Sequence, residues 1–251
     1  MKNLQINHSI KIWRYWLYKA SLGFKLKYRN SRLGITWPLL SSLIVVAIIG
    51  TVWGIILSKD SMINYYMYLF AGYSVWGILS STIEHGCNSI GNKLPGGIPF
   101  FTVVLEKLVL SLIPFIIIFP ILLASNIFLQ NFEIASIIYI ILCSILVIIW
   151  SQGMISFLIA LTSLIPDLGH FINAMMRLAF LATPIIWEVE RLGENQKYIW
   201  FNPFYIPLEA FRKALLGEGD LQLTGYLAIY SLLAWAIGWI MLKARLPELV
   251  K

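Results

Sequence analysis

A single basic residue, Arg177, interrupts a mainly apolar run at residues 171–188. A cation at the centre of a lipid bilayer costs about 2.5–3.5 kcal/mol on insertion scales. Two interpretations would meet that cost. Either the long side chain reaches the nearer membrane surface, or the cation faces water or an anionic ligand on a transport path. The sequence leaves both interpretations open.

A second group of candidate residues is aromatic and lies in the run at residues 63–83. Five of its rings share one side of a helix: Tyr65, Tyr66, Tyr68, Tyr73 and Trp76. Tyr65 and Tyr66 fit the aromatic belt that marks a membrane surface. Tyr73 and Trp76 lie deeper, where rings either pack between helices or line a path and stack on sugar faces. We take these rings, together with the arginine, as candidates for a substrate pathway.

Side chains that could do acid–base chemistry lie at the ends of apolar runs. Glu84 and His85 close one run, and Asp167 and His170 open another, so they are boundary residues without the spacing of a catalytic set. The sequence also lacks a GxxxxGK[ST] loop for ATP and the DxD, HExxH and GxSxG motifs. These absences remove the simplest routes to glycosyl transfer, metalloproteolysis and serine hydrolysis. If the protein moves a substrate against a gradient, we expect the energy to come from a partner.

Composition indicates the environment of these side chains. Of 251 residues, 59% are hydrophobic and 12% charged, and the mean hydropathy is +0.78, whereas soluble domains have about 25% charged residues. The net charge of +7 comes from basic residues that flank apolar runs, which favours a membrane protein over a nucleic-acid-binding one. Cys87 and Cys143 have no metal-ligand spacing around them, so we predict neither a disulfide nor a metal site.

Six apolar runs reach the roughly 20 residues that a membrane-spanning helix needs. They cover residues 37–58, 63–83, 107–129, 135–162, 171–188 and 223–242. The runs are continuous, unlike the alternating strands of a barrel, and backbone groups in lipid must be paired within a segment, so we expect helices. The predicted fold is an all-α integral membrane protein, with a cytoplasmic segment at 1–36 and a six-helix domain at 37–251.

The distribution of charge predicts the orientation. Eight Lys and Arg residues precede residue 37, and the first acidic residue of the chain is Asp60. Because Lys and Arg collect on the cytoplasmic side of membrane proteins, we expect both termini in the cytoplasm.

Residues 9–29 combine an apolar stripe with a basic side at helical spacing. The stripe contains Ile10, Trp13, Trp16, Leu17, Ala20 and Phe24. This pattern predicts an amphipathic helix that lies in the membrane surface.

Two connections are too long for simple turns. Residues 84–107 contain Pro95, Gly96, Gly97 and Pro99, which favour a short helix, a bend and a return to the membrane. Residues 190–220 alternate aromatic and apolar side chains, so we predict re-entrant outer helices between the fifth and sixth spans.

Three motifs resemble a known family. The first motif leads into the first run and consists of Tyr28, Arg29, Ser31, Leu33 and Gly34, followed by Trp37 and Pro38 at the start of the run. The second, late in the fifth run, is Thr183, Pro184 and Ile185, and the third, in the outer connection, is Asn202 and Pro203. In this order and on this topology, the chain resembles the membrane-spanning permease of type-2 ABC transporters, in the branch that exports lipopolysaccharide O-antigen, capsular polysaccharide and teichoic acid.

The resemblance implies a homodimer that pairs with separate nucleotide-binding ATPase subunits, which would hold ATP and Mg, while this chain holds no cofactor. It implies that Lys25, Lys27, Tyr28, Arg29 and Arg32 belong to the surface that contacts the ATPase. It also implies that Asn202 and Pro203 belong to an outer gate and that the substrate is a lipid-linked glycan.

The predicted function is therefore the permease subunit of an ATP-driven exporter that moves a lipid-linked polysaccharide, O-antigen-like or capsular, across the bacterial inner membrane. The chain is then expected to be a transport subunit and not an enzyme. The alternatives are a type-2 ABC permease for a small drug or antibiotic, an intramembrane enzyme acting on lipid-linked sugars, and a membrane scaffold without transport activity. The identity of the polysaccharide and of its lipid carrier is not encoded in any motif that we identify.

Overall fold

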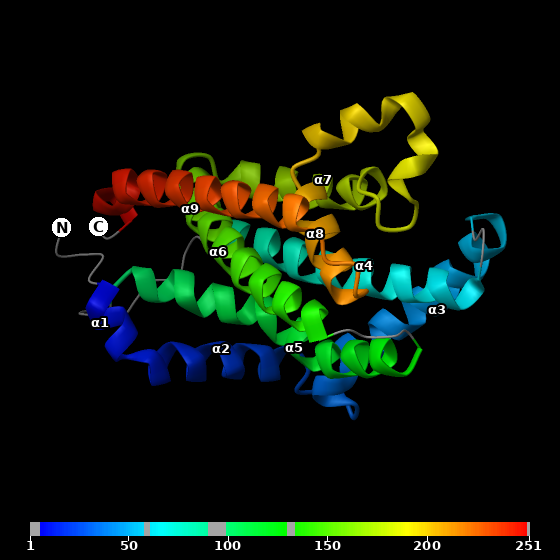
Figure 1. The fold of residues 1–251 in the computed structure, drawn as a ribbon. Helices are drawn as coiled ribbons and strands as arrows, with labels where there is room; N and C mark the ends of the chain where they lie inside the picture. The colour runs from blue at the N-terminus through cyan, green and yellow to red at the C-terminus, as the bar shows by residue number, and fades with distance from the viewer. Residues whose placement is uncertain (1–5, 58–60, 90–98, 130–133, 250–251) are drawn as a thin grey trace.

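Helices are the only regular secondary structure in the part of the chain that the computed structural model describes, residues 6–57, 61–89, 99–129 and 134–249. The helices are α1 (Ile6–Lys11), α2 (Trp13–Lys27), η1 (Gly34–Thr36), α3 (Trp37–Leu57), α4 (Met62–Cys87), α5 (Phe101–Leu129), α6 (Ile134–Leu164), α7 (Asp167–Ala182), η2 (Val189–Phe201), α8 (Tyr205–Leu215) and α9 (Leu221–Leu249). In Figure 1, α1 and the last turns of α9 lie at one end of the bundle, here named the termini end. The end of α3, the start of α4 and η2 lie at the opposite end, named the far end.

Each of the six predicted spans contains a long helical segment, but these segments differ in length and hydropathy. By length and composition, four described stretches could cross a membrane: Gly34–Ile56, Phe101–Ser125, Ser136–Leu164 and Leu221–Arg245. The chain is thus an all-helical, multi-pass membrane protein. The other two predicted spans correspond to α4, in which tyrosines, serines and glycines dilute the apolar residues, and to α7, which has only 16 residues. A total of six spanning helices stays a prediction.

The fifth predicted span ends earlier than expected, at Ala182 and not at 188. Thr183 has extended backbone angles, φ −92° and ψ 140°. It precedes Pro184, whose ring disfavours the helical conformation of the residue before it. The chain therefore leaves the helix at the motif formed by Thr183, Pro184 and Ile185.

The third predicted span begins earlier than expected, because α5 starts at Phe101 and not at 107. The helix continues through Pro114 and Pro120, as membrane helices can where neighbouring groups satisfy the freed carbonyls. The bend and return predicted between α4 and α5 fall largely on residues 90–98, outside the described residues.

The basic N-terminal segment forms two helices, α1 and α2, and the helix predicted over residues 9–29 is interrupted at Ile12. Part of its apolar stripe packs on α5, with Ala20 and Phe24 buried. Polar contacts follow the same seam: the Thr102 hydroxyl donates to Ser9 Oγ over 3.2 Å, and Lys19 Nζ lies 2.7 Å from a carboxylate oxygen of the buried Glu106. The placement of this helix in a membrane surface stays a prediction.

The core is centred on α8, which contacts α4, α6 and α9. Leu208, Phe211 and Leu215 of α8 are almost completely buried, as is Trp150 of α6. The helices predicted between the fifth and sixth spans are therefore η2 and α8. Their re-entry into a membrane stays a prediction.

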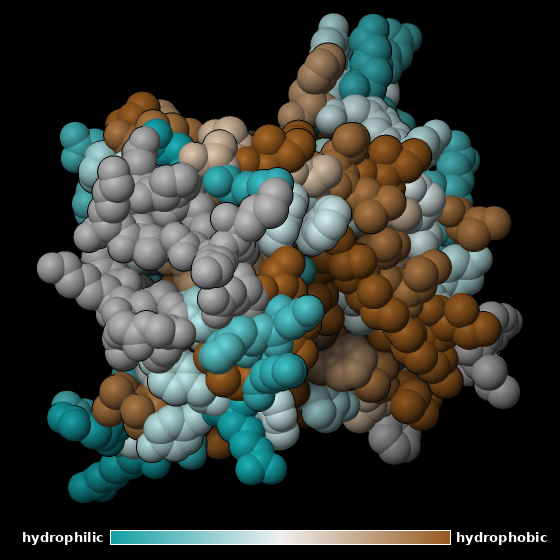
Figure 2. Space-filling view, turned by 90° about the vertical axis from the view of Figure 1, so that its left-hand side faces the viewer, coloured by the Kyte–Doolittle hydropathy of each residue, from teal (hydrophilic) through white to brown (hydrophobic). Residues whose placement is uncertain are grey.

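Apolar side chains cover much of the outer surface. Exposed examples lie on α3, α6 and α9 and include Ile48, Ile55, Ile138, Ile229 and Ile240. Figure 2, which views the termini end, shows hydrophilic side chains at its lower edge and centre beside a broad hydrophobic surface on the right. An apolar surface of this extent suits contact with lipid or with another helical chain.

Candidate functional site

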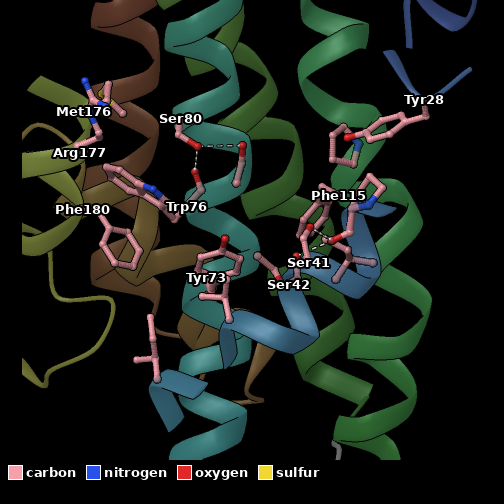
Figure 3. A pocket seen from close by; sticks show the side chains of 17 residues that line it. Tyr28, Ser41, Ser42, Tyr73, Trp76, Ser80, Phe115, Met176, Arg177 and Phe180 are labelled. Carbon is pink, nitrogen blue, oxygen red and sulfur yellow. Dashed lines mark hydrogen bonds between the residues drawn. The ribbon is translucent and has the colours of Figure 1, made fainter. Parts of the chain in front are cut away.

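Four helices and one loop residue surround a cavity of about 560 Å³. Its lining comes from α3, α4, α5, α7 and the loop after α2: Tyr28, Pro38, Ser41, Ser42, Val45, Ile49, Tyr73, Ser74, Trp76, Gly77, Ser80, Pro114, Phe115, Ile118, Met176, Arg177 and Phe180. Figure 3 shows the α7 residues on one side, those of α4 in the middle and those of α3 and α5 on the other side. The cavity contains three of the predicted pathway residues, Tyr73, Trp76 and Arg177.

An aromatic wall forms the α4–α7 side of the cavity. The ring of Phe180 meets the rings of Tyr73 and Trp76 edge-on, with centroid distances of 6.2 and 5.9 Å (Figure 3). Trp76 is only 6% exposed and also packs on Phe204 at 5.4 Å, so most of its ring serves packing. Tyr73 is half-buried, and no described side chain hydrogen-bonds to its hydroxyl. Tyr73 therefore offers a ligand both a partly exposed ring and a hydroxyl.

Serine hydroxyls supply the polar part of the lining. Ser41 and Ser42 donate to the carbonyl of Pro38 over 3.0 and 2.8 Å, and Ser80 donates to the carbonyl of Trp76 over 2.8 Å. Because each hydroxyl proton is used within its own helix, the oxygens remain free to accept hydrogen bonds. Sugar hydroxyls are suitable donors for such acceptors.

Arg177 is the only charged residue among the 17 that line the cavity. It is exposed, and within the described ranges its guanidinium has neither a salt bridge nor a hydrogen bond. No carboxylate contributes to the lining. The cavity is consequently mildly electropositive and suits a neutral or anionic ligand.

Tyr65 and Tyr68, predicted to line the same path, point elsewhere. The hydroxyl of Tyr65 donates to the carbonyl of Ile186 over 2.8 Å, and that of Tyr68 donates to the carbonyl of Trp187 over 2.9 Å. The ring of Tyr66 packs against Gly50 of α3, where a side chain would collide with it. These three rings hold other segments in place and do not line the cavity.

The two motifs predicted for the outer region meet in space. The Asn202 side-chain amide donates to the Ala182 carbonyl over 3.1 Å and to Thr183 Oγ1 over 3.0 Å. Its oxygen accepts from the Phe204 amide over 2.9 Å, and the carbonyl of Pro203 accepts from Tyr230 over 2.9 Å. Asn202 therefore links the end of α7 to the start of α8. The assignment of this link to a gate stays a prediction.

A buried ion pair fixes the same segment from the other side, and the sequence analysis missed it. Arg212 is 1% exposed, pairs with Glu209 on α8, donates to the Pro184 carbonyl over 2.6 Å and lies 3.9 Å from the centre of the Tyr68 ring. The spacing of i and i+3 within the apolar sequence of α8 could have indicated it. Burial also raises the pKa of the nearby Tyr205 to about 12.

The predicted ATPase-contacting residues divide into two groups. Lys25, Lys27, Arg29 and Arg32 are exposed. Tyr28 is half-buried: its ring packs edge-on to Phe24 at 5.2 Å and lines the cavity. The tyrosine is therefore placed between the basic surface and the cavity.

The motif before α3 forms a tight turn. Gly34 has a φ of +52°, which side-chain-bearing residues rarely adopt. Ser31 Oγ accepts from the Leu33 amide over 3.2 Å and from the Trp37 indole over 2.5 Å. Ser31, Gly34 and Trp37 thus set the angle at which α2 leads into α3.

The acid–base candidates are not brought together. Glu84, Asp167 and His170 are exposed. His85 donates to the Ser81 carbonyl over 2.8 Å in the last turns of α4, and burial lowers its pKa. In the described ranges, no three His, Cys, Asp or Glu side chains form a group that could hold a metal ion.

Comparison with known proteins identifies the family of this bundle. Residues 20–216 match the family of ABC-2 type transporters. This match runs from the second half of α2 to the end of α8 and includes the cavity, the aromatic wall and the Asn202 link. A search of the curated proteins finds no match. The chain belongs to the ABC-2 type transporter family.

Proposed function

We propose that the chain is the permease subunit of an ATP-driven exporter that moves a lipid-linked polysaccharide, of the O-antigen or capsular kind, across the bacterial inner membrane. Family membership supports the permease role and implies an ABC ATPase partner. In this proposal, ATP and Mg bind to the partner, and both termini of the permease lie in the cytoplasm.

The lining of the cavity is the observation that supports a glycan as the substrate. Its wall contains the ring of Tyr73 beside Phe180, and its serine oxygens, whose protons are donated within their own helices, are free to accept hydrogen bonds. Aromatic faces bind the apolar faces of sugar rings, and accepting oxygens suit sugar hydroxyls. Such a surface holds each sugar weakly, which allows a long chain to move through it.

A second copy of the chain is proposed to complete the path. Residues of α7 line the cavity, and on the same helix Phe171, Leu178 and Leu181 are 58–62% exposed. A homodimer formed across this region would cover these apolar side chains and place the second copy next to the cavity.

The function can be tested by deleting the gene and re-expressing the chain with its ATPase. We expect the deletion strain to lose its surface polysaccharide and to accumulate the lipid-linked glycan inside the cell. Re-expression should restore export. The Tyr73→Ala variant should restore it several-fold less well than Tyr73→Phe, since only the phenylalanine variant keeps the ring. Trp235→Ala on α9, outside the cavity, is the control.

The same strains distinguish the alternatives. Unchanged surface polysaccharide combined with increased sensitivity to a drug or antibiotic would favour the small-molecule permease. Chemical alteration of lipid-linked sugars by the purified chain without its ATPase would favour the intramembrane enzyme.

A further inference from the structure

Arg177 is a cation in apolar surroundings without a partner among the described residues. On the same helix, Phe171, Leu178 and Leu181 are largely exposed and apolar. Within a membrane, a charge in this position is costly unless water or an anion accompanies it. The structure provides no carboxylate for this purpose in the cavity that Arg177 lines. Besides water, an anionic group of a ligand would meet this cost.

The arrangement along α7 indicates what kind of anion this is. Arg177 lies one helical turn before Phe180, the ring that meets Tyr73 and Trp76 (Figure 3). A cation and an aromatic wall are thus neighbours on the cavity side. The exposed apolar residues of α7 lie beside them. One helix therefore presents an anion-binding group, a surface for sugar rings and a surface for a hydrocarbon chain.

We infer that Arg177 binds the phosphate group that joins the glycan to its lipid carrier. The guanidinium suits phosphate because its planar donors bind two oxygens at once. The first sugar would then lie on the aromatic wall and the lipid chain along the apolar surface of α7. This inference rests on the proposed function, since it assigns the phosphate to a lipid-linked glycan and not to a free anion.

The test measures binding to the permease–ATPase complex in phosphatidylcholine nanodiscs. The probes are a polyprenyl pyrophosphate, the matching polyprenol and inorganic pyrophosphate. We expect the wild-type complex to prefer the polyprenyl pyrophosphate over the polyprenol. Arg177→Gln should weaken binding of the pyrophosphate about tenfold or more, the loss expected for a hydrogen bond to a charged group, and leave polyprenol binding unchanged. Arg177→Lys should retain part of the preference.

Two controls test whether a loss of binding is specific to the cavity and is not caused by unfolding. Lys243→Gln removes an exposed cation of α9 outside the cavity and should leave all three affinities unchanged. An equal melting temperature for the wild-type and Arg177→Gln complexes would show that the fold is intact.

Three outcomes would overturn the inference. One is equal binding of the polyprenyl pyrophosphate by the wild type and Arg177→Gln. Another is a wild-type complex that does not distinguish the pyrophosphate from the polyprenol. The third is inorganic pyrophosphate binding as tightly as the lipid-linked probe, which would indicate a site for free anions. The gene-deletion experiment measures surface polysaccharide instead, so the proposed function and this inference can fail separately.

Discussion

Arg212 shows how much a single side chain can organise in this protein. Its guanidinium contacts the Glu209 carboxylate, the Pro184 carbonyl and the face of the Tyr68 ring, all in a site that excludes solvent. Pro184 follows the end of α7, and the backbone before it, at Thr183, is no longer helical. Its carbonyl therefore needs a hydrogen-bond donor from outside that helix. One buried cation therefore satisfies both a carboxylate and a backbone group that the end of the helix leaves free.

Removing one member of this ion pair should lower the stability of the protein more than removing both members. We expect Arg212→Met to destabilise the protein by about 3–5 kcal/mol, because an unpaired carboxylate stays buried. The double variant Glu209→Leu with Arg212→Met should recover part of that loss. The measurement is thermal unfolding of the purified protein in detergent, with Lys213→Met as the neighbouring control. A double variant no more stable than the single variant would contradict this explanation.

At the scale of elements, close helix contact depends on small residues. Gly153 of α6 faces the backbone of α9 so closely that an added Cβ would lie 2.5 Å from the carbonyl carbon of Ala234. Gly238 of α9 faces the backbone of Gly153 in return. Membrane helices gain most of their association energy from such packing, since lipid is as apolar as the side chains. The α6–α9 pair is therefore a rigid side of the bundle.

The glycine contact predicts opposite effects for two similar substitutions. Gly153→Ala should destabilise the protein by about 1–3 kcal/mol, the usual cost of overpacking. Gly225→Ala on α9 has no atom within 4 Å of the added Cβ and should leave stability unchanged or raise it by up to about 1 kcal/mol, because alanine favours helix. Melting temperatures of the two purified variants check this. Equal losses of stability in the two variants would show that the close contact at Gly153 does not contribute to stability.

Across the whole molecule, the basic surface formed by Lys25, Lys27, Arg29 and Arg32 and the cavity meet at Tyr28. The exposed cations Lys25, Lys27, Arg29 and Arg32 surround this residue in the sequence, while its ring reaches the cavity. A partner that binds the cations would thus act next to the cavity and to the turn that leads into α3. This placement suits a surface through which ATP hydrolysis in the partner would change the conformation of the permease.

Neutralising this basic surface tests its role. We expect glutamine at all four positions to reduce the ATPase that co-purifies with the permease several-fold, because charge pairs across an interface steer and hold partners. Replacing Arg191 and Lys197 near the far end should have no such effect. A cysteine at Tyr198, labelled from outside the cell, would report the orientation. Loss or reversal of that labelling in the glutamine variant would mean that the four cations serve mainly as a topological anchor.

The residues that line the cavity were only partly predictable from the sequence. Helical periodicity placed five rings of residues 63–83 on one side of a helix, and Tyr73 and Trp76 do line the cavity. Tyr65 and Tyr68 bind a segment about 120 residues further along the chain. Periodicity shows which side chains share a face, but the neighbour of that face depends on packing between distant helices.

The sequence by itself determined that the chain is a helical membrane protein, because continuous apolar runs in lipid must pair their backbone groups internally. It also singled out Arg177, since a cation in such a run is costly wherever it lies. Only the tertiary structure decided that Arg177 shares a cavity with Tyr73, that Asn202 joins α7 to α8, and that Glu209 and Arg212 form a buried pair. These contacts join groups from separate elements or depend on burial, and both arise from the way the helices pack.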